Sequence, residues 1–218
     1  MTPVPFLFSI VTLTLRLYTK ARRLPASYNL SVAYFADGGR WRTLGAEYLY
    51  QSPWCSFRLD KVHLPDGTKI EYGVLESAGF AAVVPVTEGG GVVLVRQWRQ
   101  PVGSFTLELP GGGLEEGEDP RETVARELLE ETGYRAEDLS PLVSVHTSPG
   151  RSTEVCYLFR CKAVRTLSEP RPEPAEFVSA LELPLPQAVE KIFAGEITAT
   201  TTVLGLLMVS GHIANVRE

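Results

Sequence analysis

The sequence predicts an α/β fold, an α/β/α sandwich on a mixed sheet, preceded by a small antiparallel N-terminal sheet. Three observations support this prediction. Short alternating segments broken by turns fill residues 41–79, two apolar segments follow within residues 80–95, and a helix with clear ends covers residues 120–132. The chain has 218 residues, 44% of them hydrophobic, which is enough for one main core.

The first 40 residues form a segment of unclear role. Its apolar tract, residues 6–15, is too short to span a bilayer. Its positive charges follow the tract, whereas a secretory signal carries them before it. The tract could be a strand, a surface-anchoring helix or residues upstream of the natural start. We therefore expect no stable membrane span and a cytoplasmic location.

Residues 41–79 are expected to form the small antiparallel sheet. Apolar and polar residues alternate in Glu47–Tyr50, Ser56–Val62 and Lys69–Leu75, which predicts three half-buried strands. Pro65-Asp66-Gly67 has the residues of a tight turn and would join the last two strands as a hairpin.

The main domain, residues 80–218, is predicted to begin with two central strands. Phe80–Val86 and Val92–Val95 are continuous apolar segments, and the glycine-rich residues 88–91 form a turn between them. A further extended segment, residues 105–110, then leads into three consecutive glycines.

A helix is predicted at Pro120–Thr132. Asp119 is an N-cap candidate, the proline stands at the first helical position, and Gly133 offers the left-handed position at which helices commonly end. The residues expected to face the core share an apolar side chain and are Val124, Ala125, Leu128 and Leu129.

Three carboxylates, Glu127, Glu130 and Glu131, lie on the neighbouring arc of this helix. Glu127 and Glu131 are four residues apart, and such a like-charge pair costs a few tenths of a kcal/mol in an isolated helix. Hard oxygen ligands on one edge are what Mg²⁺ bound to a substrate phosphate requires. The alternative is an acidic face that is merely solvated.

Two strands, a loop and two helices are predicted after this helix. The strands are Val143–Val145 and Glu154–Arg160, and residues 168–176 are a proline- and acid-rich loop. The helices are Pro186–Ala194 and Thr201–Ile213.

Charge and cysteine content exclude some functions. The net charge of −5 and the pI near 5.4 argue against nucleic-acid binding, which needs clustered Lys and Arg. Cys55, Cys156 and Cys161 are odd in number and lack zinc-like spacing, so a disulfide framework is not expected and a reducing compartment is favoured.

The stretch from Gly112 to Tyr134 resembles the Nudix box. Gly112, Glu118 and the run Arg126-Glu127-Leu128-Leu129-Glu130-Glu131-Thr132-Gly133 stand at the positions that this pattern specifies, and Tyr134 replaces its final aliphatic residue. The resemblance implies a hydrolase that cleaves a nucleoside diphosphate linked to another moiety, with Mg²⁺ or Mn²⁺. It implies that the metal ligands are Glu127, Glu131, Glu130 and the carbonyl of Gly111, with Arg126 orienting the carboxylates.

Three further segments are similar to the ADP-ribose pyrophosphatase branch of this family. They are Arg96-Gln97-Trp98-Arg99, Glu108-Leu109-Pro110, and Ser148-Pro149-Gly150, whose proline lies sixteen residues after Gly133. The resemblance implies that Arg99 contacts a substrate phosphate and that Glu108 positions a ribose or stabilises the pocket. It also implies that Ser148 and Pro149 mark the substrate subclass. A surface arginine, a strand-edge carboxylate and an ordinary turn are the alternatives.

The same resemblance implies a general base and a homodimer. Glu176, expected directly before a strand at Phe177-Val178, matches the position of the base best, with Glu173 as the second candidate. The N-terminal sheet would pair with a second subunit. Tyr72, Trp41 and Trp54 are candidates to stack on adenine there, although aromatic residues in strands are more often core.

The function predicted from the sequence is Mg²⁺-dependent hydrolysis of the pyrophosphate bond of ADP-ribose or a related nucleotide sugar, giving AMP and ribose 5-phosphate. GDP-mannose, UDP-glucose and dinucleoside polyphosphates remain alternative substrates. A Nudix domain that senses a nucleotide without hydrolysing it is the alternative of another class, although three mutually repelling acids argue against it.

Overall fold

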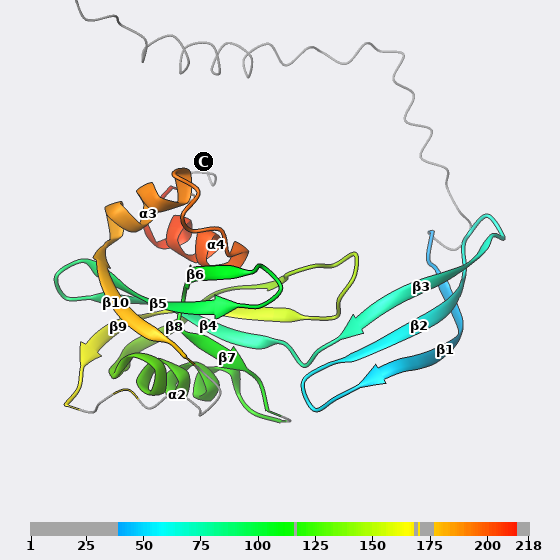
Figure 1. Cartoon of the computed structure of the whole chain (residues 1–218), viewed down its shortest axis with the longest axis horizontal. Helices are drawn as coiled ribbons and strands as arrows, with labels where there is room; N and C mark the ends of the chain where they lie inside the picture. The colour runs from blue at the N-terminus through cyan, green and yellow to red at the C-terminus, as the bar shows by residue number, and fades with distance from the viewer. Residues whose placement is uncertain (1–38, 116, 168–169, 171–176, 213–218) are drawn as a thin grey trace, which may run out of the picture. The chain divides into compact units, whose positions relative to one another are not determined.

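The computed structural model describes residues 39–115, 117–167, 170 and 177–212. These residues form two sheets and three helices, labelled in Figure 1. No helix in the described part of the chain combines the length and the apolar character needed to cross a membrane. The three cysteines are free, and Cys156 and Cys161 are buried.

The small sheet has three antiparallel strands in the order β1-β2-β3. The strands are β1 (Arg42–Gln51), β2 (Ser56–His63) and β3 (Lys69–Glu76). In the predicted hairpin turn, the amide of Leu64 donates to the carbonyl of Thr68 at 2.8 Å. The prediction of half-buried strands is wrong for β1, whose ten residues are all exposed because neither face is covered by the rest of the described chain.

The larger sheet is mixed, with the strand order β10-β5-β4-β9-β8. Strand β4 runs parallel to β9, and the other pairs are antiparallel. Strand β6 adds to β5, and the short β7 adds to β4. The bounds are β4 (Phe80–Thr87), β5 (Gly91–Arg99), β6 (Ser104–Glu108), β7 (Gly111–Gly113), β8 (Tyr134–His146), β9 (Val155–Arg165) and β10 (Ser179–Pro184).

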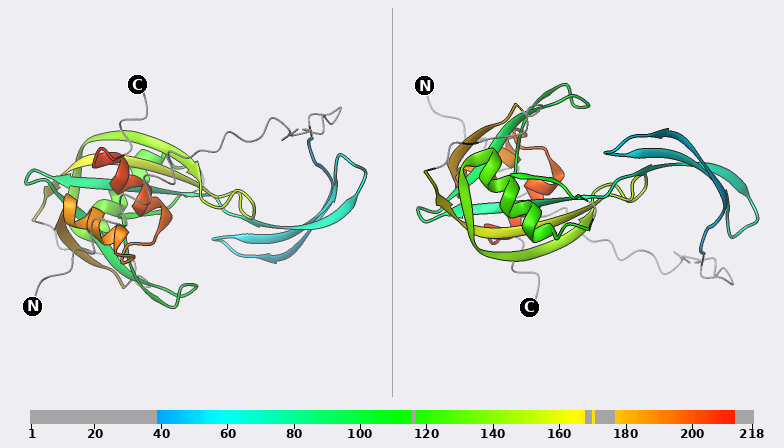
Figure 2. Two further views of the ribbon diagram at one scale, coloured as in Figure 1. Left: turned by 90° about the horizontal axis from the view of Figure 1, so that it is seen from above. Right: turned by 90° about the horizontal axis from the view of Figure 1, so that it is seen from below.

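Helices cover both faces of this sheet, which confirms the predicted α/β/α sandwich. Figure 2 shows α3 (Leu185–Phe193) and α4 (Thr200–Val209) in front when seen from above, and α2 (Pro120–Thr132) in front from below. Alternate residues of β4 serve the two cores. Val83 packs in the cluster that holds Val124 and Leu128 of α2, and Val84 packs in the cluster that holds Ala188 and Leu206.

Helix α2 has the predicted bounds and caps. The Asp119 side chain accepts a hydrogen bond from the amide of Arg121 at 2.9 Å, and Gly133 has a φ of 71°. The prediction that Leu129 faces the core is wrong, because this side chain is 38% exposed at the edge of the apolar stripe.

Other boundaries were also predicted wrongly: β1 begins at Arg42 rather than Glu47, and β9 ends at Arg165 rather than Arg160. Strand β8 begins at Tyr134 rather than Val143, and it contains a bulge between Glu137 and Ser140 where Asp138 has a φ of 53°. The strand expected at Phe177-Val178 begins at Ser179. Helix α4 ends at Val209, because Ser210 caps it and Gly211 follows with a φ of 80°; the predicted end, Ile213, lies outside the described residues.

Candidate active site

The carboxylates of α2 are not a solvated acidic face. Glu127 is only 9% exposed and Glu131 only 3% exposed, whereas Glu130 is partly exposed. Burying two carboxylates four residues apart is costly unless other groups compensate their charge. The groups that contact these two carboxylates therefore determine whether their charge is compensated.

Glu131 is held by β7 (Gly111–Gly113), which consists of three glycines and is called the glycine strand below. Its Oε2 accepts a hydrogen bond from the backbone amide of Gly111 at 3.0 Å. Gly111 pairs with Ala82 of the central strand β4, so the sheet itself fixes the position of this donor. An amide that points at a carboxylate favours the charged form of that carboxylate.

Glu127 lies directly against Gly112. A Cβ atom placed on Gly112 would lie 2.2 Å from Oε1 of Glu127, which is closer than atoms can approach. Glycine is therefore required here so that the backbone can come close to the carboxylate. At Gly111 an added Cβ would instead meet the backbone oxygen of Ala81, also at 2.2 Å.

Arg126 compensates the charge of three carboxylates. Its Nη1 donates to Oε1 of Glu127 at 2.8 Å and to Oε2 of Glu130 at 3.2 Å, and its Nη2 lies 3.4 Å from Oε1 of Glu118. Burial lowers the pKa of Arg126, but the charges of Glu127 and Glu118 outweigh burial and raise it above its ordinary value. The guanidinium therefore stays charged and orients the acids.

Glu118 is a part of this network to which sequence reasoning gave no role. The amide of Glu115 donates to its carboxylate at 3.1 Å, and this bond is the largest cause of its lowered pKa, with Arg126 adding to the effect. The signal that could have identified Glu118 is its place in the box pattern, eight residues before Arg126.

These residues fit a divalent cation that keeps part of its water shell. Mg²⁺ is typically held by one or two carboxylates together with substrate phosphates, rather than by a cage of protein ligands. Glu127 and Glu131 offer such a small set of hard oxygens at one edge of the helix, and Gly111 of β7 lies beside Glu131. Within the described residues no three His, Cys, Asp or Glu side chains are arranged as a complete metal site.

Arg99 and Glu108 form a bidentate ion pair on the α2 side of the sheet. Nε and Nη2 of Arg99 donate to the two carboxylate oxygens of Glu108 at 2.8 and 2.7 Å, and Thr106 donates to Oε1 at 2.5 Å. Val92 and Leu94 face α3 and α4, so the alternation of β5 turns Arg99 to the other face. The structure thus brings these two predicted residues together.

Between Glu108 and Gly111 the chain stops pairing with strand β5 and begins to pair with strand β4. Glu108 is the last residue of β6, which pairs with β5, and Gly111 is the first residue of β7, which pairs with β4. In the connection the amide of Leu109 donates to Thr202 Oγ1 at 3.0 Å, and the carbonyl of Pro110 accepts from the amide of Val83 at 3.0 Å.

We expect Glu108→Gln to lower the free energy of unfolding at pH 7. Burial raises the pKa of Glu108, but Arg99 and Thr106 outweigh burial and bring it below the ordinary 4.5. A lowered pKa gives stability that is complete above the unfolded-state pKa and is lost as the pH falls through the folded-state value. The loss on substitution should therefore shrink below about pH 4.5.

Chemical denaturation from neutral to acidic pH measures this difference, and Glu71→Gln, at an exposed position on β3, is the control. A loss for Glu108→Gln that is the same at all pH values would contradict the argument.

Tyr72 lies beside the Ser148-Pro149-Gly150 turn. Its hydroxyl donates to the carbonyl of Gly150 at 2.5 Å. The carbonyl of Ser148 accepts from the amides of Arg151 and Ser152, both at 2.9 Å, which closes the turn. The structure therefore brings Tyr72 next to the turn that contains Ser148 and Pro149.

The remaining candidates are exposed or outside the described residues. Trp41 is 53% exposed and Trp54 is 83% exposed. Glu176 and Glu173, the candidates for the general base, are outside the described residues.

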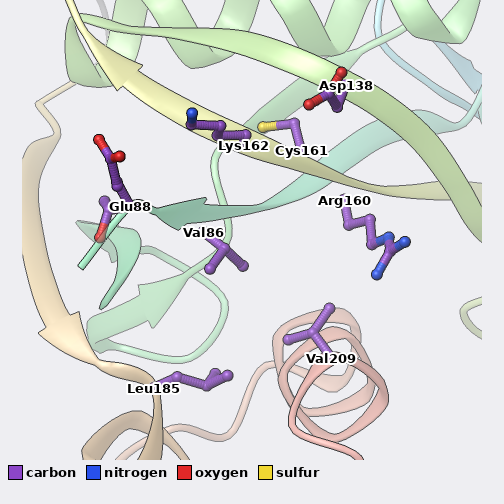
Figure 3. A pocket seen from close by; sticks show the side chains of 9 residues that line it. Val86, Glu88, Asp138, Arg160, Cys161, Lys162, Leu185 and Val209 are labelled. Atoms are coloured by element: carbon purple, nitrogen blue, oxygen red, sulfur yellow. The ribbon is translucent and has the colours of Figure 1, made fainter. Parts of the chain in front are cut away.

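A pocket of about 390 Å³ lies elsewhere and contains none of the predicted site residues (Figure 3). It opens at the end of β4 and beside the middle of β9, near Leu185 and Val209 of the helices on the other face of the sheet. Arg160, Lys162, Glu88 and Asp138 mix both charge signs in its lining.

Two family models match the chain. The NUDIX domain model matches residues 78–200, and the model of the nucleoside diphosphate sugar hydrolase N-terminal domain matches residues 41–75. The first match covers the larger sheet, helix α2 and helix α3. The second covers the small sheet up to Leu75, the penultimate residue of β3.

Curated relatives match most of the chain. An ADP-ribose pyrophosphatase of Bacillus subtilis is 32% identical over 72% of this chain and 85% of its own length. A methanol dehydrogenase activator of Bacillus methanolicus is 34% identical, over 76% of this chain and 90% of its own length. An ADP-ribose pyrophosphatase of Mycobacterium tuberculosis is 31% identical, over 78% of this chain and 83% of its own length.

The residues of the site lie within the region that the NUDIX domain model matches. The arginine and the carboxylates of α2, together with the glycine strand beside them, occupy the stretch that resembles the Nudix box, and the matched family model spans more than half of the chain. This chain therefore belongs to the Nudix hydrolase family.

Proposed function

We propose that this chain catalyses the Mg²⁺-dependent hydrolysis of ADP-ribose, giving AMP and ribose 5-phosphate. The observation that carries the proposal is the pair of buried carboxylates, Glu127 and Glu131, against the backbone of the glycine strand. The names of the relatives from Bacillus subtilis and Mycobacterium tuberculosis support the substrate. In the reaction a water oxygen forms a new bond to phosphorus, and the bond from that phosphorus to the bridging oxygen breaks.

Glu127, Glu131 and the carbonyl of Gly111 would hold the cation, with Glu130 acting directly or through water. The bound cation would neutralise charge on the pyrophosphate and polarise it toward attack. Arg126 keeps the carboxylates in place through its bonds to Glu127 and Glu130. Its positive charge offsets the mutual repulsion of these two carboxylates.

Arg99 would bind a substrate phosphate. Glu108 holds its guanidinium through two hydrogen bonds, so the orientation of this group is set before substrate arrives. Glu176 as the general base stays a prediction, with Glu173 as the second candidate. Ser148, Pro149 and Tyr72 are proposed to contact the distal part of the substrate.

The chain is also proposed to act as a homodimer through its small sheet. The large apolar side chains exposed on β1 and β2 are Leu44, Tyr48, Leu49, Tyr50 and Phe57. Such a group of exposed apolar residues on a sheet favours association with another surface. A second copy of this sheet would cover them.

A turnover screen tests the proposal. The purified chain is incubated with Mg²⁺ and ADP-ribose, GDP-mannose, UDP-glucose or a dinucleoside polyphosphate, and the products are identified by mass. We expect the highest kcat/KM for ADP-ribose, with AMP and ribose 5-phosphate as products. A higher value for another nucleotide would change the substrate but keep the hydrolase, and tight binding without turnover would favour a sensor.

A further inference from the structure

The C-terminal end of α2 is capped by residues of another strand. The last carbonyls of a helix have no partner within the helix, and the last turn of α2 contains no basic residue. Arg165, the last residue of β9, donates from Nη1 to the carbonyl of Thr132 at 3.1 Å. Thr166 donates to the carbonyl of Gly133 from its amide at 3.1 Å and from its hydroxyl at 2.8 Å. A cation at this end also stabilises the helix dipole.

Tyr134, the residue that departs from the family pattern, adds a second contact. Its hydroxyl donates to Oε2 of Glu182 in β10 at 3.0 Å. Oε1 of Glu182 accepts from Thr87 Oγ1 at 2.7 Å, so this carboxylate joins β8, β10 and the end of β4. The guanidinium of Arg165 lies 5.0 Å from the centre of the Tyr134 ring. This cation–π contact links the arginine that caps α2 to the tyrosine that contacts Glu182.

Glu182 is an exposed residue of β10 whose carboxylate lies close to the start of β5. A Cβ atom placed on Gly91 would lie 2.4 Å from its Oε1, and the hydroxyl of Thr87 is also bonded to the amide of Gly91 at 3.0 Å. The carboxylate that Tyr134 contacts is therefore held by hydrogen bonds from two side chains, Tyr134 and Thr87.

The capped end of the helix is next to the chemistry of the proposed function. Glu131 directly precedes Thr132, and its carboxylate is bonded to Gly111 on β7. A shift or rotation of the last turn would move Glu131 relative to this strand. Functional groups must be held within about 0.5 Å of their working geometry, so an anchor at this end has consequences for metal binding.

We propose that Arg165, Thr166 and the Tyr134–Glu182 hydrogen bond form an anchor that positions Glu131 for the divalent cation. These four are positioning residues, which act through the helix without touching the cation. The inference rests on the proposed function, in which Glu131 is a metal ligand. It explains why a tyrosine is accommodated where the family pattern has an aliphatic residue, because the hydroxyl has a carboxylate partner on β10.

Binding of Mn²⁺ without substrate tests the anchor, measured from the signal of free Mn²⁺ in electron paramagnetic resonance. We expect Arg165→Met and Tyr134→Phe each to weaken Mn²⁺ binding by about tenfold, the lower end of the loss found when a group that orients a metal ligand is removed. Arg165→Lys keeps a cation within reach of the Thr132 carbonyl, so its Kd should lie closer to that of the unsubstituted chain.

Two matched controls separate the anchor from general stability. Arg160→Met removes an exposed arginine from the same strand, and Tyr157→Phe removes a hydroxyl from a partly buried tyrosine in the cluster beneath α2. Neither should change the Mn²⁺ affinity, and thermal unfolding is measured for every variant. A lowered Tm with unchanged Mn²⁺ affinity in Arg165→Met and Tyr134→Phe would overturn the anchor and leave only a structural role.

Failure of the anchor is distinguishable from failure of the proposed function. Hydrolysis of ADP-ribose by the unsubstituted chain tests the function, whereas the ratio of Mn²⁺ dissociation constants tests the anchor. If Glu131→Gln binds Mn²⁺ as tightly as the unsubstituted chain, the metal assignment is wrong and the anchor proposal is overturned with it.

Discussion

Glu131→Gln should lower kcat/KM for ADP-ribose by about a hundredfold or more while the fold stays intact. The amide oxygen of glutamine can still accept the hydrogen bond that Gly111 donates to Oε2 at 3.0 Å. What the substitution removes is one negative charge at a buried position. Stability should change little, since relief of the repulsion between Glu131 and Glu127 offsets part of any loss.

Steady-state kinetics with varied Mg²⁺, together with thermal unfolding, measures these two effects. The matched control is Glu122→Gln, which removes an exposed carboxylate from the first turn of the same helix. It should retain normal activity and lose only a small favourable interaction with the helix dipole. A near-normal rate for Glu131→Gln would show that the carboxylates of α2 do not act as the proposed metal ligands.

Gly112→Ala should weaken divalent-metal binding by about tenfold to a hundredfold. The added Cβ would lie 2.2 Å from Oε1 and 2.4 Å from Cδ of Glu127. Both atoms belong to the end of a side chain, which can rotate away from the added Cβ, whereas backbone atoms cannot. The rotation would move the carboxylate from its place beside the glycine strand and from its bond with Arg126 at 2.8 Å.

The neighbouring glycines are controls with different expected outcomes. A Cβ on Gly113 meets nothing within 4 Å, so Gly113→Ala should bind metal normally. A Cβ on Gly111 meets backbone atoms of Ala81 and Ala82 at 2.2 and 2.7 Å, so Gly111→Ala should lower the Tm. Equal metal affinity in Gly112→Ala and Gly113→Ala would show that the close approach to Glu127 has no role in metal binding.

The helix ends and the order of most elements could be predicted because their signals are local. Asp119, Pro120 and Gly133 determine where α2 begins and ends through contacts within a few residues. The first half of β8 could not be predicted, since its polar residues extend only because they pair with the end of β9. Register in that segment also depends on the bulge at Asp138, which no short-range pattern indicates.

The burial of Glu127 and Glu131 could not be derived from the helix alone. Three acids in five residues favour exposure by local electrostatics, and their resemblance to the box was what indicated a site. Burial depends on features that the helix does not contain, namely the amide of Gly111 and the absence of a side chain at Gly112. The pairing of Arg99 with Glu108 likewise arises only when β5 and β6 lie side by side.

The short connection between β6, which pairs with β5, and β7, which pairs with β4, limits how far apart two parts of the site can lie. Glu108, which holds Arg99, and Gly111, which holds Glu131, are joined by only Leu109 and Pro110. Three residue steps of fully extended chain span at most about 11 Å. Arg99, which is proposed to bind phosphate, and the carboxylates of α2 are therefore tethered, and one inserted residue at this connection would alter their separation without removing any side chain from either.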